Sequence, residues 1–145
     1  QLKLIGAVSQ EVLDTISEFR LNDFVLNLGY VSHQEAVEHQ RKSQVLLLIE
    51  INSNDTKSII PGKLFEYMVS ERPIIAFGPE GSDFAEIITS TNTGIFFLYD
   101  ELEQLKELLL KYYNLYAAQN LKVHAIGLQQ YSRRSLTEKL SKLIS

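Results

Sequence analysis

The chain of 145 residues has the length of one domain, and its 45% content of hydrophobic residues is enough for a core. Its net charge of −4, with the 14 Lys and Arg scattered along the sequence, argues against a general nucleic-acid binder. The absence of cysteine excludes disulfides and thiol chemistry, and neither a signal peptide nor an apolar run of about 20 residues is present.

Strand-like and helix-like segments alternate from the start of the chain. Residues 2–8 predict a short apolar strand, and Ser9 is placed to cap the helix that follows. Residues 24–28 predict a second strand, and Ser32 with Glu35 matches a capping box, which predicts the start of a second helix. Because the chain opens in strand-like sequence without an initiator methionine, we expect it to be a piece of a longer protein.

The middle of the chain pairs its most apolar segment with its most polar one. Residues 45–51 form an almost unbroken apolar run, which predicts a parallel strand covered on both faces. Residues 52–60 are polar and rich in turn formers, so we expect a loop at the carboxyl end of that strand. A helix over residues 62–70 and a strand over residues 73–77 are predicted to follow.

The last third of the chain contains one more strand and several helices. After the Gly/Pro turn at 78–81, Ser82 is placed to cap a helix over residues 83–89, and residues 94–98 predict the last strand. A stripe of apolar and aromatic residues predicts a long helix: Leu102, Leu105, Leu109, Tyr112, Tyr113 and Tyr116. The final helix is predicted to begin with a second capping box at 135–138.

This alternation predicts the fold class. It indicates an α/β protein with a Rossmann-like three-layer sandwich, in which a parallel sheet lies between helices, as one domain over residues 1–145. Ligands of such sheets bind beyond the carboxyl ends of the strands. The loops after Val8, Leu28 and Ile51 are therefore expected to converge on the binding site.

The segment 60–68 is the strongest candidate for that site. It predicts a helix that opens on Pro61 and Gly62, and a helix opening offers unpaired N–H groups and a positive dipole end to a phosphate. Lys63 adds a cation, and the carboxylate of Glu66 can accept hydrogen bonds from neighbouring hydroxyls. A diphosphate next to a polyol is the outline of a sugar nucleotide.

Each of these residues also has a plain structural explanation. A Pro-Gly pair is common at helix starts, a helix lysine is usually solvated, and a first-turn glutamate complements the helix dipole. The long polar loop 52–60 favours a site, because a simple connection needs less. No histidine pair has metal-ligand spacing, and no glycine-rich phosphate loop, nucleophile elbow or Asp-x-Asp pair is present, so a catalytic residue stays unidentified.

Four blocks of the sequence resemble a known family. Residues 29–36, 45–51, 61–68 and 72–75 look, in this order, like the C-terminal half of a GT-B-fold glycosyltransferase of the bacterial family-4-like type. The resemblance covers nearly the whole chain, and its most specific part is the Pro-Gly-Lys-Leu-x-Glu-Tyr block. In such enzymes this half binds the nucleotide-sugar donor, and an N-terminal domain, absent here, binds the acceptor.

The resemblance implies roles for individual residues. The glutamate that matches Glu66 holds the ribose hydroxyls, and the backbone near Tyr30 and Val31 faces the base. Backbone amides lie by the diphosphate or the sugar at three positions: Gly62, Lys63 and Leu64. The donor is the substrate, and no cofactor or metal is expected.

Two departures from the family pattern limit these roles. The family usually carries a second glutamate, close to the donor sugar, eight positions before the ribose-binding one, and Ser58 stands there in this chain. The family's basic phosphate-clamping residues usually precede the strand with which this chain begins. We therefore expect the isolated domain to bind nucleotide weakly and to have no turnover.

The resemblance also implies a setting and leaves alternatives. The whole protein is expected to take part in polysaccharide or cell-envelope glycan synthesis in the cytoplasm, at the inner face of the membrane, which the missing half would contact. No nucleic acid and no transmembrane segment is expected. The alternatives are an epimerase-type GT-B protein acting on nucleotide sugars and a non-catalytic Rossmann-like interaction domain.

Overall fold

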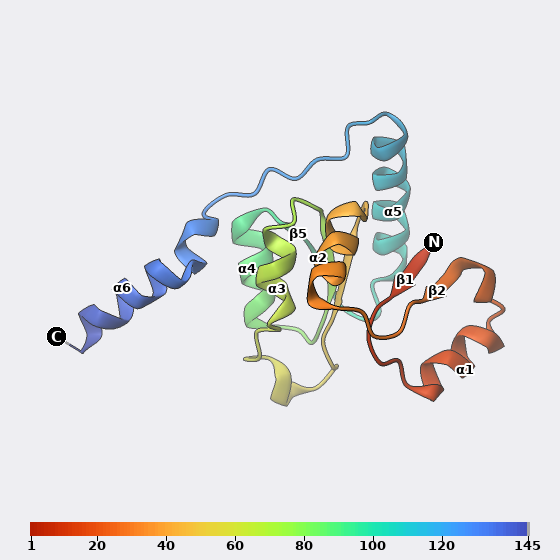
Figure 1. The fold of residues 1–145 in the computed structure, drawn as a ribbon, viewed down its shortest axis with the longest axis horizontal. Coiled ribbons are helices and arrows are strands. Elements are labelled where there is room, and N and C mark those ends of the chain that lie inside the picture. The colour runs from red at the N-terminus through yellow and green to blue at the C-terminus, as the bar shows by residue number, and fades with distance from the viewer. Residues whose placement is uncertain (145) are drawn as a thin grey trace. The chain divides into compact units, whose positions relative to one another are not determined.

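A computed structural model describes residues 1–144 and shows an α/β protein with parallel sheets (Figure 1). Its contacts divide the chain into two compact units: unit 1 comprises Gln1–His39, and unit 2 begins at Gln40. The boundary falls inside one helix, α2 (His33–Lys42).

Unit 1 contains a sheet of two short strands. Its elements before α2 are β1 (Leu2–Leu4), α1 (Gln10–Glu18), the 3-10 turn η1 (Asn22–Phe24) and β2 (Val25–Asn27). The strands are parallel, with Leu2 opposite Val25. They are three residues long, shorter than predicted, and no residue of unit 1 is buried.

Both helix starts predicted in unit 1 are confirmed. The hydroxyl of Ser9 accepts a hydrogen bond from the amide of Val12 at 3.4 Å. The amide and hydroxyl of Ser32 donate to the Glu35 carboxylate at 2.8 and 2.7 Å, and the Glu35 amide donates back to the Ser32 hydroxyl at 3.2 Å. This reciprocal pairing satisfies N–H groups that a helix start leaves open.

Unit 2 contains a three-stranded parallel sheet. Its elements after α2 are β3 (Leu46–Ile49), the 3-10 turn η2 (Asn54–Thr56), α3 (Lys63–Met68), β4 (Ile74–Phe77), α4 (Asp83–Thr91), β5 (Gly94–Phe97), α5 (Leu102–Ala117), the 3-10 turn η3 (Leu128–Tyr131) and α6 (Arg133–Leu143). The strand order is β3-β4-β5, so β4 is central, with Leu46 opposite Ile74 and Ile74 opposite Gly94.

Helices cover the two faces of this sheet. On one face, α3 and α4 pack against β3 and β4 to form the larger core cluster: Leu48, Leu64, Met68, Ile74, Ala76, Phe84, Ile87 and Ile88. On the other face, α5 packs against β4 and β5, where Leu108 joins Ile75 and Phe97. Unit 2 is thus built of three layers, and the core of the described residues lies within it.

The strands pair in two sheets, where the alternation of elements predicted one. In unit 1, β1 and β2 pair only with each other; in unit 2, β3 pairs only with β4, so its other edge has no strand among the described residues.

The prediction that the run 45–51 is covered on both faces was wrong. Leu46 and Leu48 of β3 are buried, but Leu47 and Ile49 expose 37% and 60% of their surface. These two residues share the face that α5 covers over β4 and β5, and α5 does not bury them. An edge strand keeps one of its faces open even when its sequence is apolar throughout.

Two other helix starts differ from the prediction. Ser82 occupies the cap position of α4, but its hydroxyl donates to the carbonyl of Pro79 and accepts no bond from a helix amide. The predicted capping box at 135–138 was wrong, since α6 begins at Arg133 and Ser132 caps it by accepting from the Ser135 amide at 3.2 Å. Several serines compete for such starts, and the local backbone decides among them.

The stripe predicted for the long helix was correct only in part. Leu105 and Tyr112 of α5 pack against the sheet, together with Leu108, which the stripe did not include. The other members of the stripe are exposed: Leu102, Leu109, Tyr113 and Tyr116.

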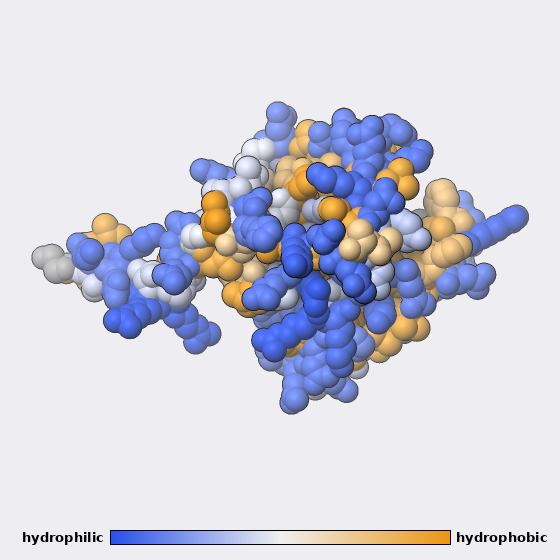
Figure 2. All heavy atoms as spheres, turned by 90° about the horizontal axis from the view of Figure 1, so that it is seen from above, coloured by the Kyte–Doolittle hydropathy of each residue, from blue (hydrophilic) through white to orange (hydrophobic). Residues whose placement is uncertain are grey.

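Hydrophilic side chains cover most of the face drawn in Figure 2, with separate apolar patches between them. No helix in the described part of the chain is both long and apolar enough to cross a membrane.

Candidate functional site

The start of α3 presents unused backbone donors. Gly62 precedes the helix in a helical conformation, with φ −57° and ψ −32°, and no side chain caps it. The amide of Leu64 donates to the carbonyl of Pro61 at 2.9 Å. The amides of Gly62 and Lys63 have no hydrogen-bond partner within residues 1–144, so they are free to meet a ligand.

The helix is anchored on one side and open on the other. Leu64 and Met68 expose 0% and 3% of their surface and belong to the core, whereas Lys63 and Glu66 are exposed. Residues three apart on a helix are neighbours on its surface, so a cation and a carboxylate stand side by side here. The helix spans six residues and not the predicted 62–70, because it ends where the Ser70 hydroxyl donates to the Tyr67 carbonyl at 2.6 Å.

The carboxylate of Glu66 is held by a residue that the sequence did not indicate. The side-chain amide of Gln40, at the end of α2, donates to Glu66 Oε2 at 3.3 Å. This contact orients the carboxylate and leaves further acceptor positions for a ligand hydroxyl. Burial raises the pKa of the neighbouring Tyr67, and the charge of Glu66 raises it further, so the phenol stays neutral near pH 7.

The polar loop before α3 is an ordered segment. The Thr56 hydroxyl bonds to the carbonyls of Ile51 and Ser53 at 2.7 and 2.9 Å, and the Lys57 carbonyl accepts from the amide of Asp83 at 2.9 Å. Ser58 is exposed and has no partner among the described residues. These hydrogen bonds fix the backbone of the loop between β3 and α3, and the hydroxyl of Ser58 faces solvent.

Tyr30 and Val31 belong to unit 1, and the other five predicted site residues belong to unit 2. Both follow Gly29, whose φ of +64° favours glycine and whose carbonyl accepts from the Gly6 amide at 2.7 Å. The loops after β1 and β2, two of the three predicted to converge, thus meet within unit 1. Tyr30 exposes 85% of its surface, a ring available for stacking.

A hollow of about 410 Å³ lies at the carboxyl ends of the strands of unit 2. One lining residue follows each strand: Asn52, Gly78 and Leu98. Its polar lining also contains Glu80, Tyr99 and Asp100, which the sequence interpretation missed although Tyr99 and Asp100 follow a predicted strand end as well.

The chemistry of this hollow does not suit a phosphate. Glu80 and Asp100 place two carboxylates in it, and the Tyr99 hydroxyl is occupied by donation to the carbonyl of Glu50. Burial, followed by the charge of Glu50, raises the pKa of Tyr99, so the ring remains a neutral donor. Hydroxyl groups fit such a lining better than anions do.

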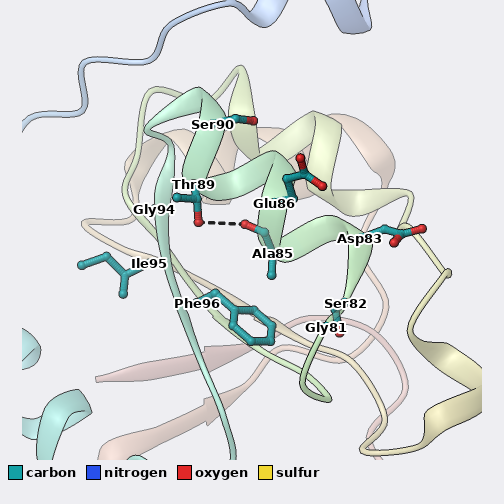
Figure 3. Close-up of a pocket in the computed structure, with 10 residues that line it drawn as sticks. All are labelled: Gly81, Ser82, Asp83, Ala85, Glu86, Thr89, Ser90, Gly94, Ile95 and Phe96. Atoms are coloured by element: carbon teal, nitrogen blue, oxygen red, sulfur yellow. Dashed lines mark hydrogen bonds between the residues drawn. The ribbon is translucent and has the colours of Figure 1, made fainter.

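A second, larger hollow of about 720 Å³ lies between α4 and β5 (Figure 3). Neither hollow contains any of the seven residues predicted to bind the donor: Tyr30, Val31, Ser58, Gly62, Lys63, Leu64 and Glu66. The start of α3 thus lies in neither hollow, and Lys63 and Glu66 are exposed to solvent there. Within residues 1–144 no group of three or more His, Asp or Glu side chains is arranged to hold a metal ion.

Comparison with known protein families, with characterised proteins and with solved structures finds no match for this chain.

Proposed function

We propose that this chain is the donor-binding part of a glycosyltransferase that uses a nucleotide-diphosphate sugar. One observation carries the proposal: α3 offers two unengaged amides and Lys63 beside a carboxylate that Gln40 holds in place. The resemblance to the C-terminal half of a GT-B glycosyltransferase leads one to expect donors at Gly62 and Lys63 and an acceptor at Glu66, as well as a third donor at Leu64, whose amide bonds to Pro61 instead.

The diphosphate would lie at the start of α3. The amides of Gly62 and Lys63 would donate to its oxygens, and the Lys63 ammonium would balance its charge. Because α3 has only six residues, its dipole is small, and we assign most of the attraction to these local donors. This placement requires no metal ion.

The ribose would lie beside Glu66. The Glu66 carboxylate accepts hydrogen bonds, the side-chain amide of Gln40 restricts its orientation, and Glu66 lies one helical turn from Lys63. We assign the base to the segment at Tyr30 and Val31 on the resemblance alone.

The reaction would break the bond between the sugar's anomeric carbon and the diphosphate oxygen and form a bond to an acceptor oxygen. This chain would stabilise the charge that develops on the departing diphosphate. An N-terminal domain of the whole protein would bind the acceptor and would contain any base that takes the acceptor's proton. We place that protein in polysaccharide or cell-envelope glycan synthesis, in the cytoplasm at the inner face of the membrane.

Calorimetric titration of the chain with UDP, GDP, ADP and the matching nucleosides tests the site. We expect one diphosphate to be preferred, and Glu66→Ala to weaken it by about 1–3 kcal/mol, because ribose hydroxyls lose their acceptor. Lys63→Ala should weaken the diphosphate more than the nucleoside. The matched controls, Glu107→Ala and Lys106→Ala on the exposed side of α5, should change nothing. Equal effects at the sites and the controls would refute the assignment.

Two alternatives predict other results. A non-catalytic interaction domain is favoured by one observation, that neither hollow contains a predicted donor-binding residue. It predicts no nucleotide binding even in the whole protein. The glycosyltransferase proposal, with its phosphate clamp outside this chain, predicts weak binding by this chain and tight binding by the whole protein. An epimerase-type GT-B protein predicts a water-dependent product from the nucleotide sugar.

A further inference from the structure

The hollow between α4 and β5 is a groove along a free strand edge (Figure 3). β5 pairs with β4 on one side and has no strand on its other side among the described residues. The groove therefore has the edge of β5 as one wall and α4 as the other, with a volume of about 720 Å³ between them.

The strand edge in this groove has unused hydrogen-bonding groups. The Ile74 amide donates to the Thr93 carbonyl at 3.0 Å, and the Gly78 amide donates to the Phe97 carbonyl at 3.4 Å. Alternate residues of a parallel strand bond to the same neighbour, so Gly94 and Phe96 direct their N–H and C=O groups away from β4. No charged residue or proline protects β5, and such an edge is a template for another strand.

The groove has room for a polypeptide backbone. The α4 residues nearest β5 in Figure 3, Ala85 and Thr89, have small side chains. The Thr89 hydroxyl donates to the Ala85 carbonyl at 2.9 Å, so it needs no hydrogen bond to a bound peptide. The Phe96 ring, which packs edge-on against Phe84 at 5.4 Å, gives the groove an apolar floor.

The charge along the rim of the groove determines which ligands it can bind. Asp83 and Glu86 line the outer side of the groove, and neither carboxylate has an ion-pair or hydrogen-bond partner among the described residues. No lysine, arginine or histidine lines it. This complementarity favours a cationic guest and excludes a phosphate, so the groove is chemically different from the start of α3.

We propose that the groove between α4 and β5 binds an extended peptide segment with basic side chains, which joins the sheet as a strand at the free edge of β5. The backbone of the peptide bonds to Gly94 and Phe96, and basic side chains on its α4 side reach Glu86 and Asp83. Backbone pairing provides the general affinity in this mode of recognition, and side chains on alternate positions provide the selectivity. This binding is independent of the donor site.

A labelled octapeptide of alternating lysine and valine tests the proposal, with an octapeptide of alternating glutamate and valine as the control peptide. Anisotropy should show binding of the lysine peptide only. Glu86→Lys should weaken it by about three- to fivefold, and Glu107→Lys, the same charge change on exposed α5, should leave it nearly unchanged. Thr89→Trp fills the groove without altering charge and should abolish binding.

Amide exchange locates the peptide. Binding should slow the exchange of the Gly94 and Phe96 amides and leave those of β3 unchanged. The proposal is overturned by equal losses in Glu86→Lys and Glu107→Lys, by unaltered exchange at β5, or by no binding up to about 1 mM peptide. Protection of the same amides by self-association, without peptide, would also overturn it.

Discussion

Unit 1 and unit 2 use the same kinds of element and differ in what those elements enclose. Unit 1 has two strands and a helix before α2, and none of its residues is buried. Unit 2 covers both faces of a three-stranded sheet with helices and contains two core clusters. A two-stranded sheet has too little surface to stabilise itself, whereas three strands between helices can exclude water. Secondary structure alone therefore does not make a stable unit.

The largest expected effect is the removal of a core ring from unit 2. Phe84→Ala deletes a side chain with 0% exposure that packs against Phe96, and it should lower the free energy of unfolding by about 3–5 kcal/mol. Phe24→Ala, at a ring of unit 1 with 64% exposure, should cost less than about 1 kcal/mol. Urea unfolding of both variants measures the difference, and similar losses would contradict the contrast between the units.

Hydrogen exchange should show the same contrast without mutation. The amides of Ile75 and Ala76 lie in the central strand of unit 2, so their exchange requires opening of its core. The amides of β1 and β2 in unit 1 should exchange at least about 100-fold faster, because local opening exposes no buried surface there. Equal protection in β1, β2 and β4 would show that the two units open together.

A smaller difference is expected between two threonines that make the same bond. Thr91 Oγ1 bonds to the Ile87 carbonyl at 2.6 Å in α4, and Thr15 Oγ1 bonds to the Glu11 carbonyl at 2.8 Å in α1. Thr91 is fully buried and also bonds to Thr93 at 2.9 Å, so Thr91→Val should cost about 1–3 kcal/mol by leaving a buried hydroxyl unpaired. Thr15→Val should stay within about 0.5 kcal/mol in thermal unfolding. A larger loss at Thr15 would reverse the contrast.

The smallest effect belongs to the capping box of α2. Hydrogen bonds from the Ser32 hydroxyl and then its amide hold the pKa of Glu35 below its ordinary value of 4.5. A lowered pKa gives stability that is present above the unfolded value and is lost as the pH falls through the folded value. The cap should therefore weaken below about pH 4.5.

Ser32→Ala tests this by removing the hydroxyl. It should destabilise the start of α2 by about 1 kcal/mol and return the pKa of Glu35 towards 4.5, as followed by NMR titration of its carboxyl. An unchanged pKa in the variant would show that the hydroxyl bond has no influence. Ser17→Ala, at an exposed hydroxyl of the same unit, is the control.

The local elements could be predicted because their signals lie within a few residues. Ser9 and the pair Ser32–Glu35 cap their helices as predicted, since each bond spans three residues. The prediction failed at Ser82 and at the box 135–138, where neighbouring carbonyls and a competing serine were equally close in sequence. Strands were predicted in the right places and too long, because ladder pairing and not apolar sequence ends a strand.

The candidate site shows the same division. Lys63 and Glu66 could be identified as neighbours from helix periodicity, and their exposure follows from the burial of Leu64 and Met68. Gln40, which holds Glu66, could not be found, because it lies 26 residues away and the contact exists only in the folded chain. Glu80 and Asp100 each follow a predicted strand end, but only the folded sheet brings them together in one hollow.

The sequence by itself determined the α/β class, the parallel strands, and the helices with the caps at Ser9 and Ser32, because periodicity and capping act over one or two turns of chain. The tertiary structure alone decided the rest: two sheets in place of one, the open face of β3, and the groove beside β5. It also decided why Gly94 must be glycine, since a Cβ there would fall 2.1 Å from the carbonyl oxygen of Ile74. These features depend on which distant segments pack together, and that is set by the sum of many contacts along the whole chain.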